Sequence, residues 1–190
     1  SWVVPILVIP VFGTLFYLFL KLQPGVKLIN RRIQSLEKGI APYLVQNEEV
    51  LREYNNISSS EGNLARYMNR YGWFPVYQNT NVEYFPLGDD VFPAMLEELR
   101  KAEKYIFLEY FIISPGIFWD SMVEILKEKH AAGVDVRVIY DDVGSLNTLP
   151  MNYARKFETE TGIPCCCFNR FKPVISIRMN NRDHRKFCII

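Results

Sequence analysis

The chain has 190 residues, enough for one domain with a real core or for a smaller domain with an added segment. Hydrophobic residues make up 49% of it and its formal net charge is +1, which excludes a disordered tail and a uniformly basic nucleic-acid binder. The four cysteines lack the spacing of a disulfide framework or a zinc site. We expect reduced cysteines that act mostly as apolar strand residues, at Cys165, Cys166, Cys167 and Cys188.

The first segment is strongly apolar. Trp2–Leu20 carries no charge, and a helix of that length can cross a hydrocarbon core roughly 30 Å thick. A signal peptide would need a basic leader, a shorter apolar core and a small-residue cleavage site. A buried helix of a soluble domain would be weakened by Pro5, Pro10 and Gly13. The sequence therefore predicts a transmembrane helix within residues 1–22.

A basic region follows, and we assign residues 23–75 to a juxtamembrane helical region and linker. By the positive-inside tendency, its cations predict that the chain downstream of the apolar helix lies in the cytoplasm. Apolar residues recur at helical steps over Lys27–Ala41, which indicates a helix that lies on an anionic lipid surface or packs on the next domain. The polar stretch Asn55–Gly62 predicts a loop.

From residue 76 onward, strand patterns alternate with helix patterns. Such an order predicts an α/β fold with a largely parallel sheet and right-handed crossovers. Asp89 is expected to cap the first helix, and Gly133 and Gly162 are expected to end the later two. Tyr105–Ile113 is so apolar that we expect it to be covered on both faces. The other expected strands are Val82–Phe85, Val134–Tyr140 and Ile163–Phe168.

The last ten residues hold the side chains best suited to chemistry. His184 and Lys186 stand two apart at the start of an apolar strand, so they project from the same face. Imidazole is a nucleophile at neutral pH, and an ammonium group can neutralise the oxygens of a phosphodiester. Arg182 and Arg185 add positive charge and are candidate substrate-binding residues. A chance His-x-Lys match arises roughly once in ten such chains, so the pair needs context.

That context is present in three segments: Ile106–Ile113, Val136–Ser145 and Asn181–Lys186. With the anchor and the basic region, they resemble the phospholipase D superfamily and, within it, the bacterial cardiolipin synthases. The superfamily signature is H-x-K-x4-D, and His184 and Lys186 match its first two positions. Its aspartate is expected as the first residue beyond Ile190. The resemblance implies that residues 76–190 are the first, incomplete part of a phospholipase D-like catalytic domain with a mixed or largely parallel sheet flanked by helices.

The resemblance also implies a reaction, one that needs no metal ion and no cofactor. His184 would attack the phosphorus of a phosphodiester and form a phosphohistidine, while Lys186 holds the non-bridging oxygens. In such synthases one phosphatidylglycerol donates its phosphatidyl group, a second accepts it, and glycerol leaves. The expected partners are thus membrane phospholipids and not nucleic acid. The resemblance also implies a location at the bacterial inner or plasma membrane, with the catalytic domain in the cytoplasm. A histidine from a second motif would protonate the leaving alcohol. The chain lacks that motif, so we expect no turnover from it alone.

Other polar residues allow more than one reading. Glu109 lies within an apolar strand, where it can support the site as a substrate-binding or orienting residue, or form a structural ion pair. Asp141 and Asp142 follow a strand, a place where ligands often bind but where acidic residues also cap turns. His130, near a helix end, fits a surface role favoured by the helix dipole.

Three other functions remain open from the sequence. A hydrolytic phospholipase D would use the same nucleophile and resolve the intermediate with water. A single-motif phosphodiesterase or nuclease would complete its site by forming a homodimer, and its DNA binding would weaken steeply with salt. A membrane-tethered lipid-binding scaffold would need no catalysis, and it would tolerate replacement of His184 by alanine.

Overall fold

The computed structural model describes residues 3–22, 35, 38–170 and 182–190. Two compact units make up the chain, Ser1–Val82 and Glu83–Ile190. The domain boundaries expected at residues 22 and 75 stay predictions. Most of the basic segment Lys27–Ala41 lies outside the described residues.

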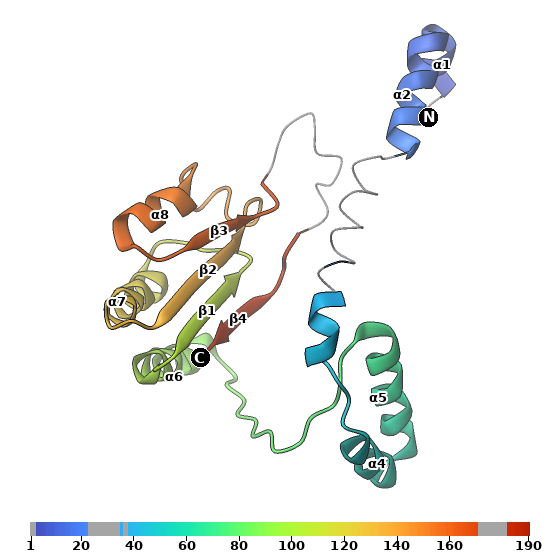
Figure 1. The fold of residues 1–190 in the computed structure, drawn as a ribbon. Helices are drawn as coiled ribbons and strands as arrows, with labels where there is room; N and C mark the ends of the chain where they lie inside the picture. The colour runs from blue at the N-terminus through green and yellow to red at the C-terminus, as the bar shows by residue number, and fades with distance from the viewer. Residues whose placement is uncertain (1–2, 23–34, 36–37, 171–181) are drawn as a thin grey trace. The chain divides into compact units, whose positions relative to one another are not determined.

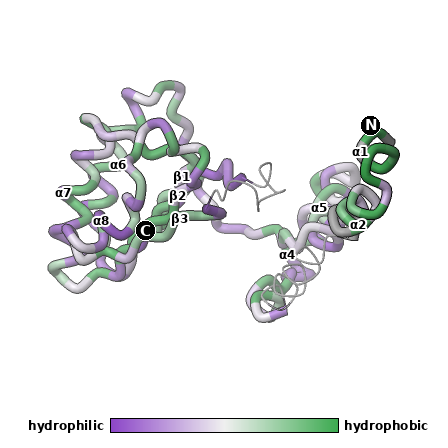
Figure 2. The backbone as a smooth tube through the Cα atoms, turned by 90° about the horizontal axis from the view of Figure 1, so that it is seen from above, coloured by the Kyte–Doolittle hydropathy of each residue, from purple (hydrophilic) through white to green (hydrophobic). Residues whose placement is uncertain are grey.

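The apolar N-terminal segment forms two helices, α1 (Val3–Val8) and α2 (Pro10–Leu22), both mostly hydrophobic (Figure 2). The helix breaks at Ile9 because the following proline ring disfavours helical backbone in the residue before it. The 13 residues of α2 span about 20 Å, less than a hydrocarbon core roughly 30 Å thick. Within the described residues, no helix has the length and hydropathy that crossing a membrane requires. The predicted transmembrane helix is therefore not supported.

The rest of the first unit is a pair of helices, α4 (Glu48–Ile57) and α5 (Ser59–Gly72), preceded by a short 3-10 helix η1 (Ala41–Tyr43). The side chain of Asn47 caps α4, and that of Ser58 caps α5 by accepting a hydrogen bond from the Glu61 N–H at 3.4 Å. The loop predicted over Asn55–Gly62 is therefore wrong. Ser58 in this stretch is an N-cap between two helices, because a hydroxyl that accepts a hydrogen bond from the first N–H groups favours a new helix there.

The second unit has an α/β fold, as the alternating pattern predicted (Figure 1). A mixed sheet has the strand order β3-β2-β1-β4; the first three of these are mutually parallel, and β4 runs antiparallel to β1. The strands are β1 (Tyr105–Tyr110), β2 (Asp135–Asp141), β3 (Cys165–Phe168) and β4 (Lys186–Ile189). The helices are α6 (Gly88–Lys101), α7 (Ile117–Ala131) and α8 (Tyr153–Thr161).

The core lies between one face of this sheet and the three helices, which all stand on the same side of it (Figure 1). Ile106 and Leu108 of β1 point into the core and are almost completely buried, whereas the alternating Phe107 and Glu109 stay partly exposed. The expectation that this strand is covered on both faces is therefore wrong for the described residues. An apolar run alone does not show which of its residues a helix covers.

The helix ends agree with the glycine signals, but the predicted cap of α6 and the predicted strand before it are wrong. Gly133 and Gly162 follow α7 and α8 with positive φ, a conformation that glycine adopts without strain. Asp89 lies in the first turn of α6 and makes no capping hydrogen bond; Leu87 is at the cap position. Residues 82–85 form no strand, and Val82 and Tyr84 are more than four-fifths exposed. Strand-like composition does not form a strand without a partner to hydrogen-bond.

Candidate active site

The polar residues of the second unit converge at one edge of the sheet. The parallel strands β1 and β2 end there at Tyr110 and Asp141, and the antiparallel β4 begins there at Lys186, which is paired with Tyr110. Ligands commonly bind at this carboxyl edge of α/β sheets. The topology therefore brings His184, 43 residues beyond the end of β2, to the place where β1 and β2 end.

His184 and Lys186 lie side by side, and both are exposed. The imidazole ring packs on the ring of Phe111 with 4.7 Å between centroids, and the Lys186 ammonium lies 5.1 Å from the centroid of the same ring. Lys186 Nζ also donates a hydrogen bond to the backbone carbonyl of His184 at 2.6 Å. A nucleophilic nitrogen and a cation are thus presented together at an open edge, which suits an anionic ester.

Asp141 holds the segment that leads into β4. Its carboxylate is completely buried, and Oδ2 accepts a hydrogen bond from the backbone N–H of Asp183 at 3.0 Å. The other oxygen accepts one from the Gly144 N–H at 2.9 Å and lies 3.4 Å from Nη1 of Arg182. Because Asp183 directly precedes His184, this carboxylate fixes the backbone from which the histidine projects.

Arg182 points into the protein. Its side chain is only 12% exposed, and Nη1 donates to the backbone carbonyl of Asn169 at 3.0 Å as well as facing Asp141. A buried guanidinium is tolerated here because a buried carboxylate is close by. Its expected contact with a substrate stays a prediction, and the described geometry gives it a structural partner.

Arg185 belongs to a second charged group, with Glu109 and Asp183. Arg185 Nη2 lies 2.7 Å from a buried carboxylate oxygen of Glu109, in an ion pair that is not aligned as a hydrogen bond, and Arg185 Nε donates to Asp183 Oδ1 at 2.9 Å. Glu109 is paired in the sheet with Phe187, whereas Lys186 is paired with Tyr110. Since side chains alternate along a strand, Arg185 and Lys186 project to opposite faces of the sheet.

The two carboxyl groups of this cluster titrate differently. Burial, a hydrogen bond with Asp183 and the negative charge of Asp183 raise the pKa of Glu109 from 4.5 to about 7, although the charge of Arg185 acts to lower it. Burial acts to raise the pKa of Asp183 too, but hydrogen bonds with Glu109 and Arg185 hold it below its usual value. The arrangement favours one proton on Glu109 and a negative charge on Asp183. The contact with Arg185 agrees with the structural reading of Glu109, and its substrate-binding or orienting role stays a prediction.

His130 lies at the other edge of the sheet. It is in the last turn of α7, where its backbone carbonyl accepts from the Gly133 N–H at 3.0 Å, just before β2 begins at Asp135. Since the site is at the opposite end of β2, this imidazole stands a full strand length from His184. In the described part of the chain, no group of three or more His, Cys, Asp or Glu side chains could hold a metal ion.

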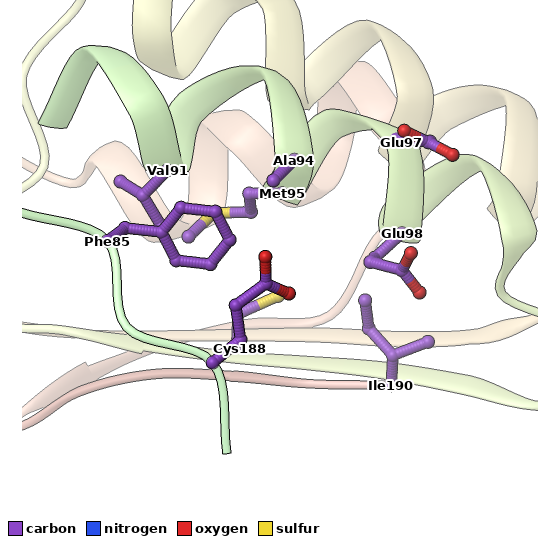
Figure 3. Close-up of a pocket in the computed structure, with 9 residues that line it drawn as sticks. Phe85, Val91, Ala94, Met95, Glu97, Glu98, Cys188 and Ile190 are labelled. Carbon is purple, nitrogen blue, oxygen red and sulfur yellow. The ribbon is translucent and has the colours of Figure 1, made fainter. Parts of the chain in front are cut away.

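A cavity of about 570 Å³ lies between α6 and β4 (Figure 3). Three carboxylates line it, and they would repel a phosphate group. We therefore do not assign the phosphodiester chemistry to this cavity. Its lining consists of Glu83, Phe85, Val91, Ala94, Met95, Glu97, Glu98, Cys188 and Ile190.

The four cysteines are free, as expected, and three of them carry perturbed thiols. Burial raises the pKa of Cys165 to about 12 and that of Cys188 to about 11. Burial, with a hydrogen bond to Asp142, raises the pKa of Cys167 to about 11. These thiols are poor nucleophiles at neutral pH and serve as apolar side chains between the sheet and the helices.

Phe111 and Asp183 were not identified from the sequence as part of this group. Phe111 lies within the apolar run Tyr105–Ile113, and no local pattern distinguishes it from core residues. Asp183 next to the His-x-Lys pair could have been noticed, because an acidic residue among cations needs partners. Gly144 also contributes, since a Cβ atom there would lie 2.7 Å from the Phe111 ring and close to its carbonyl oxygen.

No family model matches the chain. Its relatives include an uncharacterized protein of Streptococcus mutans, 40% identical over 190 residues, which cover all of this chain and 41% of the relative. A cardiolipin synthase of Oceanobacillus iheyensis is 30% identical over 200 residues, covering all of this chain and 40% of the relative. Cardiolipin synthase 1 of Staphylococcus aureus is 27% identical over 205 residues, again covering all of this chain and 39% of the relative.

The chain is thus similar over its entire length to proteins named cardiolipin synthase, which confirms the resemblance drawn from its residues. It spans about 40% of the length of these relatives.

Proposed function

We propose that this chain supplies the nucleophilic part of a phospholipase D-type site that transfers a phosphatidyl group from one phosphatidylglycerol to another. The product would be cardiolipin, with release of glycerol. The observation that carries the proposal is the pairing of the His184 imidazole with the Lys186 ammonium on one aromatic ring at the open carboxyl edge of the sheet. Full-length similarity to proteins named cardiolipin synthase supports it.

His184 acts as the nucleophile in this mechanism. A ring nitrogen attacks the phosphorus of the first phosphatidylglycerol, the bond from phosphorus to the headgroup glycerol oxygen breaks, and glycerol leaves after taking a proton. A hydroxyl of the second phosphatidylglycerol then loses its proton and attacks the phosphohistidine, which frees His184. The Lys186 ammonium holds the non-bridging oxygens, where negative charge accumulates during both steps.

The ion pairs around the site support the roles assigned to His184 and Lys186. Arg182 and Arg185 are each paired with carboxylates, at 3.4 Å from Asp141 and 2.7 Å from Glu109. Lys186, by contrast, faces an aromatic ring and a backbone carbonyl. A phosphate group that binds at this edge could therefore replace the present contacts of the Lys186 ammonium at a low cost in free energy.

The reaction also needs an acid for the leaving alcohol, and His130 cannot serve because it lies at the opposite edge of the sheet. We therefore propose that a second histidine, supplied outside these 190 residues, completes the site, and that the chain alone gives no turnover. The lipid substrates place the working protein at a membrane. Among the described residues no helix is long and apolar enough to span a membrane, and the proposed location rests on the lipid substrates alone.

The test uses the protein expressed from its complete reading frame, added to vesicles of phosphatidylglycerol. We expect cardiolipin and free glycerol in equal amounts from the wild type, and no product from His184→Ala. Lys186→Ala should lower the rate by about 100-fold, because the developing charge loses its cation. His130→Ala is the matched control and should keep the wild-type rate.

Each alternative predicts a different product. Phosphatidic acid in place of cardiolipin would identify a hydrolase that uses the same nucleophile. Cleavage of a DNA oligonucleotide, lost in His184→Ala and weakened by salt, would identify a nuclease. Vesicle binding that is unchanged in His184→Ala, with no product from either protein, would leave a lipid-binding scaffold and overturn the proposed enzyme.

A further inference from the structure

The ring of Phe111 contacts both side chains of the His-x-Lys pair. Its centroid is 4.7 Å from that of the His184 ring, with 53° between the planes, and 5.1 Å from Lys186 Nζ. Tilted ring pairs and an ammonium near an aromatic face are both attractive arrangements. One side chain therefore holds two groups that belong to a different segment of the chain, more than 70 residues away.

Phe111 itself is held firmly. Its backbone carbonyl accepts a hydrogen bond from Ser145 Oγ at 3.4 Å, and that hydroxyl accepts one from the Ile113 N–H at 3.1 Å. Ser145 is only 1% exposed. The backbone of Gly144 packs against the ring so closely that a Cβ atom there would lie 2.7 Å from it. The ring is thus fixed between the end of β1 and the turn after β2.

Within the part of the chain that the structure describes, the two groups it contacts have little other support. His184 precedes β4, and both it and Lys186 are exposed. Exposed side chains sample several rotamers, and fixing them in one arrangement before a reaction removes an entropic part of the barrier. A rigid apolar ring can do this without offering a polar group that competes for the phosphate.

We propose that Phe111 is a positioning residue that holds the imidazole of His184 and the ammonium of Lys186 next to each other. This inference rests on the function proposed for the pair. Phe111 takes no part in bond making, and its contribution is the ring face that both groups share. An aromatic replacement should therefore preserve the effect, and an aliphatic one of similar volume should not.

The first test measures phosphatidyl transfer by the protein from its complete reading frame. Phe111→Leu should lower kcat by about tenfold, because the pair loses its shared support. Phe111→Tyr should stay within about twofold of the wild type, since the ring is retained. Phe107→Leu is the matched control in β1: its ring stacks on Tyr105 at 5.1 Å rather than on the pair, and the rate should not change. Equal rates for Phe111→Leu and Phe111→Tyr would overturn the inference.

The second test needs no activity and uses the 190-residue chain. A proton of the His184 ring that lies over an aromatic ring resonates upfield, so Phe111→Leu should move the His184 ring signals downfield in proton NMR, and Phe111→Tyr should keep them near their original positions. The signals of His130 should stay unchanged in both variants. If the His184 signals do not move in Phe111→Leu, the contact is absent and the inference fails.

The two tests separate the two proposals. If the His184 signals depend on the Phe111 ring but the wild-type protein makes no product, the proposed function fails and the ring contact remains. If transfer occurs but Phe111→Leu leaves both the rate and the signals unchanged, the proposed function stands and the positioning role is wrong.

Discussion

The buried carboxylate of Asp141 accepts a hydrogen bond from the backbone N–H of Asp183 at 3.0 Å, although the two residues are 42 positions apart. This contact joins the end of β2 to the segment that carries His184. The other carboxylate oxygen of Asp141 contacts the Gly144 N–H and the Arg182 guanidinium. A single side chain therefore holds three groups next to the site.

Replacement of Asp141 by asparagine should therefore be costly. The amide group would direct N–H donors at the N–H of Asp183 or of Gly144, and Arg182 would lose a buried counter-charge. We expect a loss of about 3 kcal/mol in the free energy of unfolding, measured by urea titration. Asp135→Asn is the control, because its ion pair with Arg137 is largely exposed and should cost less than about 1 kcal/mol. Equal losses in the two variants would contradict the anchoring role.

Stability should depend on pH through Glu109. Its pKa is raised to about 7 in the folded chain, so between pH 4.5 and 7 the folded state binds more protons than the unfolded state. The stabilisation is complete below pH 4.5 and is lost as pH rises through 7. Glu109→Gln mimics the protonated form and should flatten this decline in urea titrations across that range. Glu98→Gln, at an exposed position, should leave the decline in place.

Gly144 should not accept a side chain. In Gly144→Ala, the added Cβ would meet the ring and the carbonyl oxygen of Phe111, both of which are held by other contacts. We expect a loss of about 1 to 3 kcal/mol in the free energy of unfolding, as for other overpacked sites. Gly88→Ala is the control, because its Cβ would meet no atom within 4 Å. Unchanged stability in Gly144→Ala would show that Phe111 can move.

The thiols should differ in their reactivity toward iodoacetamide at pH 8. Burial raises the pKa of Cys165, Cys167 and Cys188, so few of these groups are thiolates, whereas Cys166 is exposed. We expect mass spectrometry to find Cys166 alkylated at least about tenfold faster than the other three. Cys166→Ser should remove the fast reaction, and unfolding in urea should make all four cysteines reactive. A second fast-reacting thiol in the folded chain would contradict the burial of Cys165, Cys167 or Cys188.

The sequence by itself predicted the alternating strands and helices of the second unit, the glycines that end two helices, and a His-x-Lys pair at the start of an apolar strand. These features are local, because hydrophobic periodicity and glycine conformation act over a few residues. Local patterns failed where the outcome depends on a partner or on a single backbone group. Residues 82–85 have no strand beside them, and Ser58 caps a helix where a loop was expected.

Tertiary structure decided what surrounds the pair. The sequence offered Arg182, Arg185 and Glu109 as candidate ligands for a substrate, but the fold pairs them with Asp141, Asp183 and one another. It also brings Phe111 under His184 and Lys186. These contacts join residues that are mostly more than 40 positions apart, and they form because β4 pairs antiparallel with β1. No periodicity within one segment encodes which distant side chains such a pairing brings together.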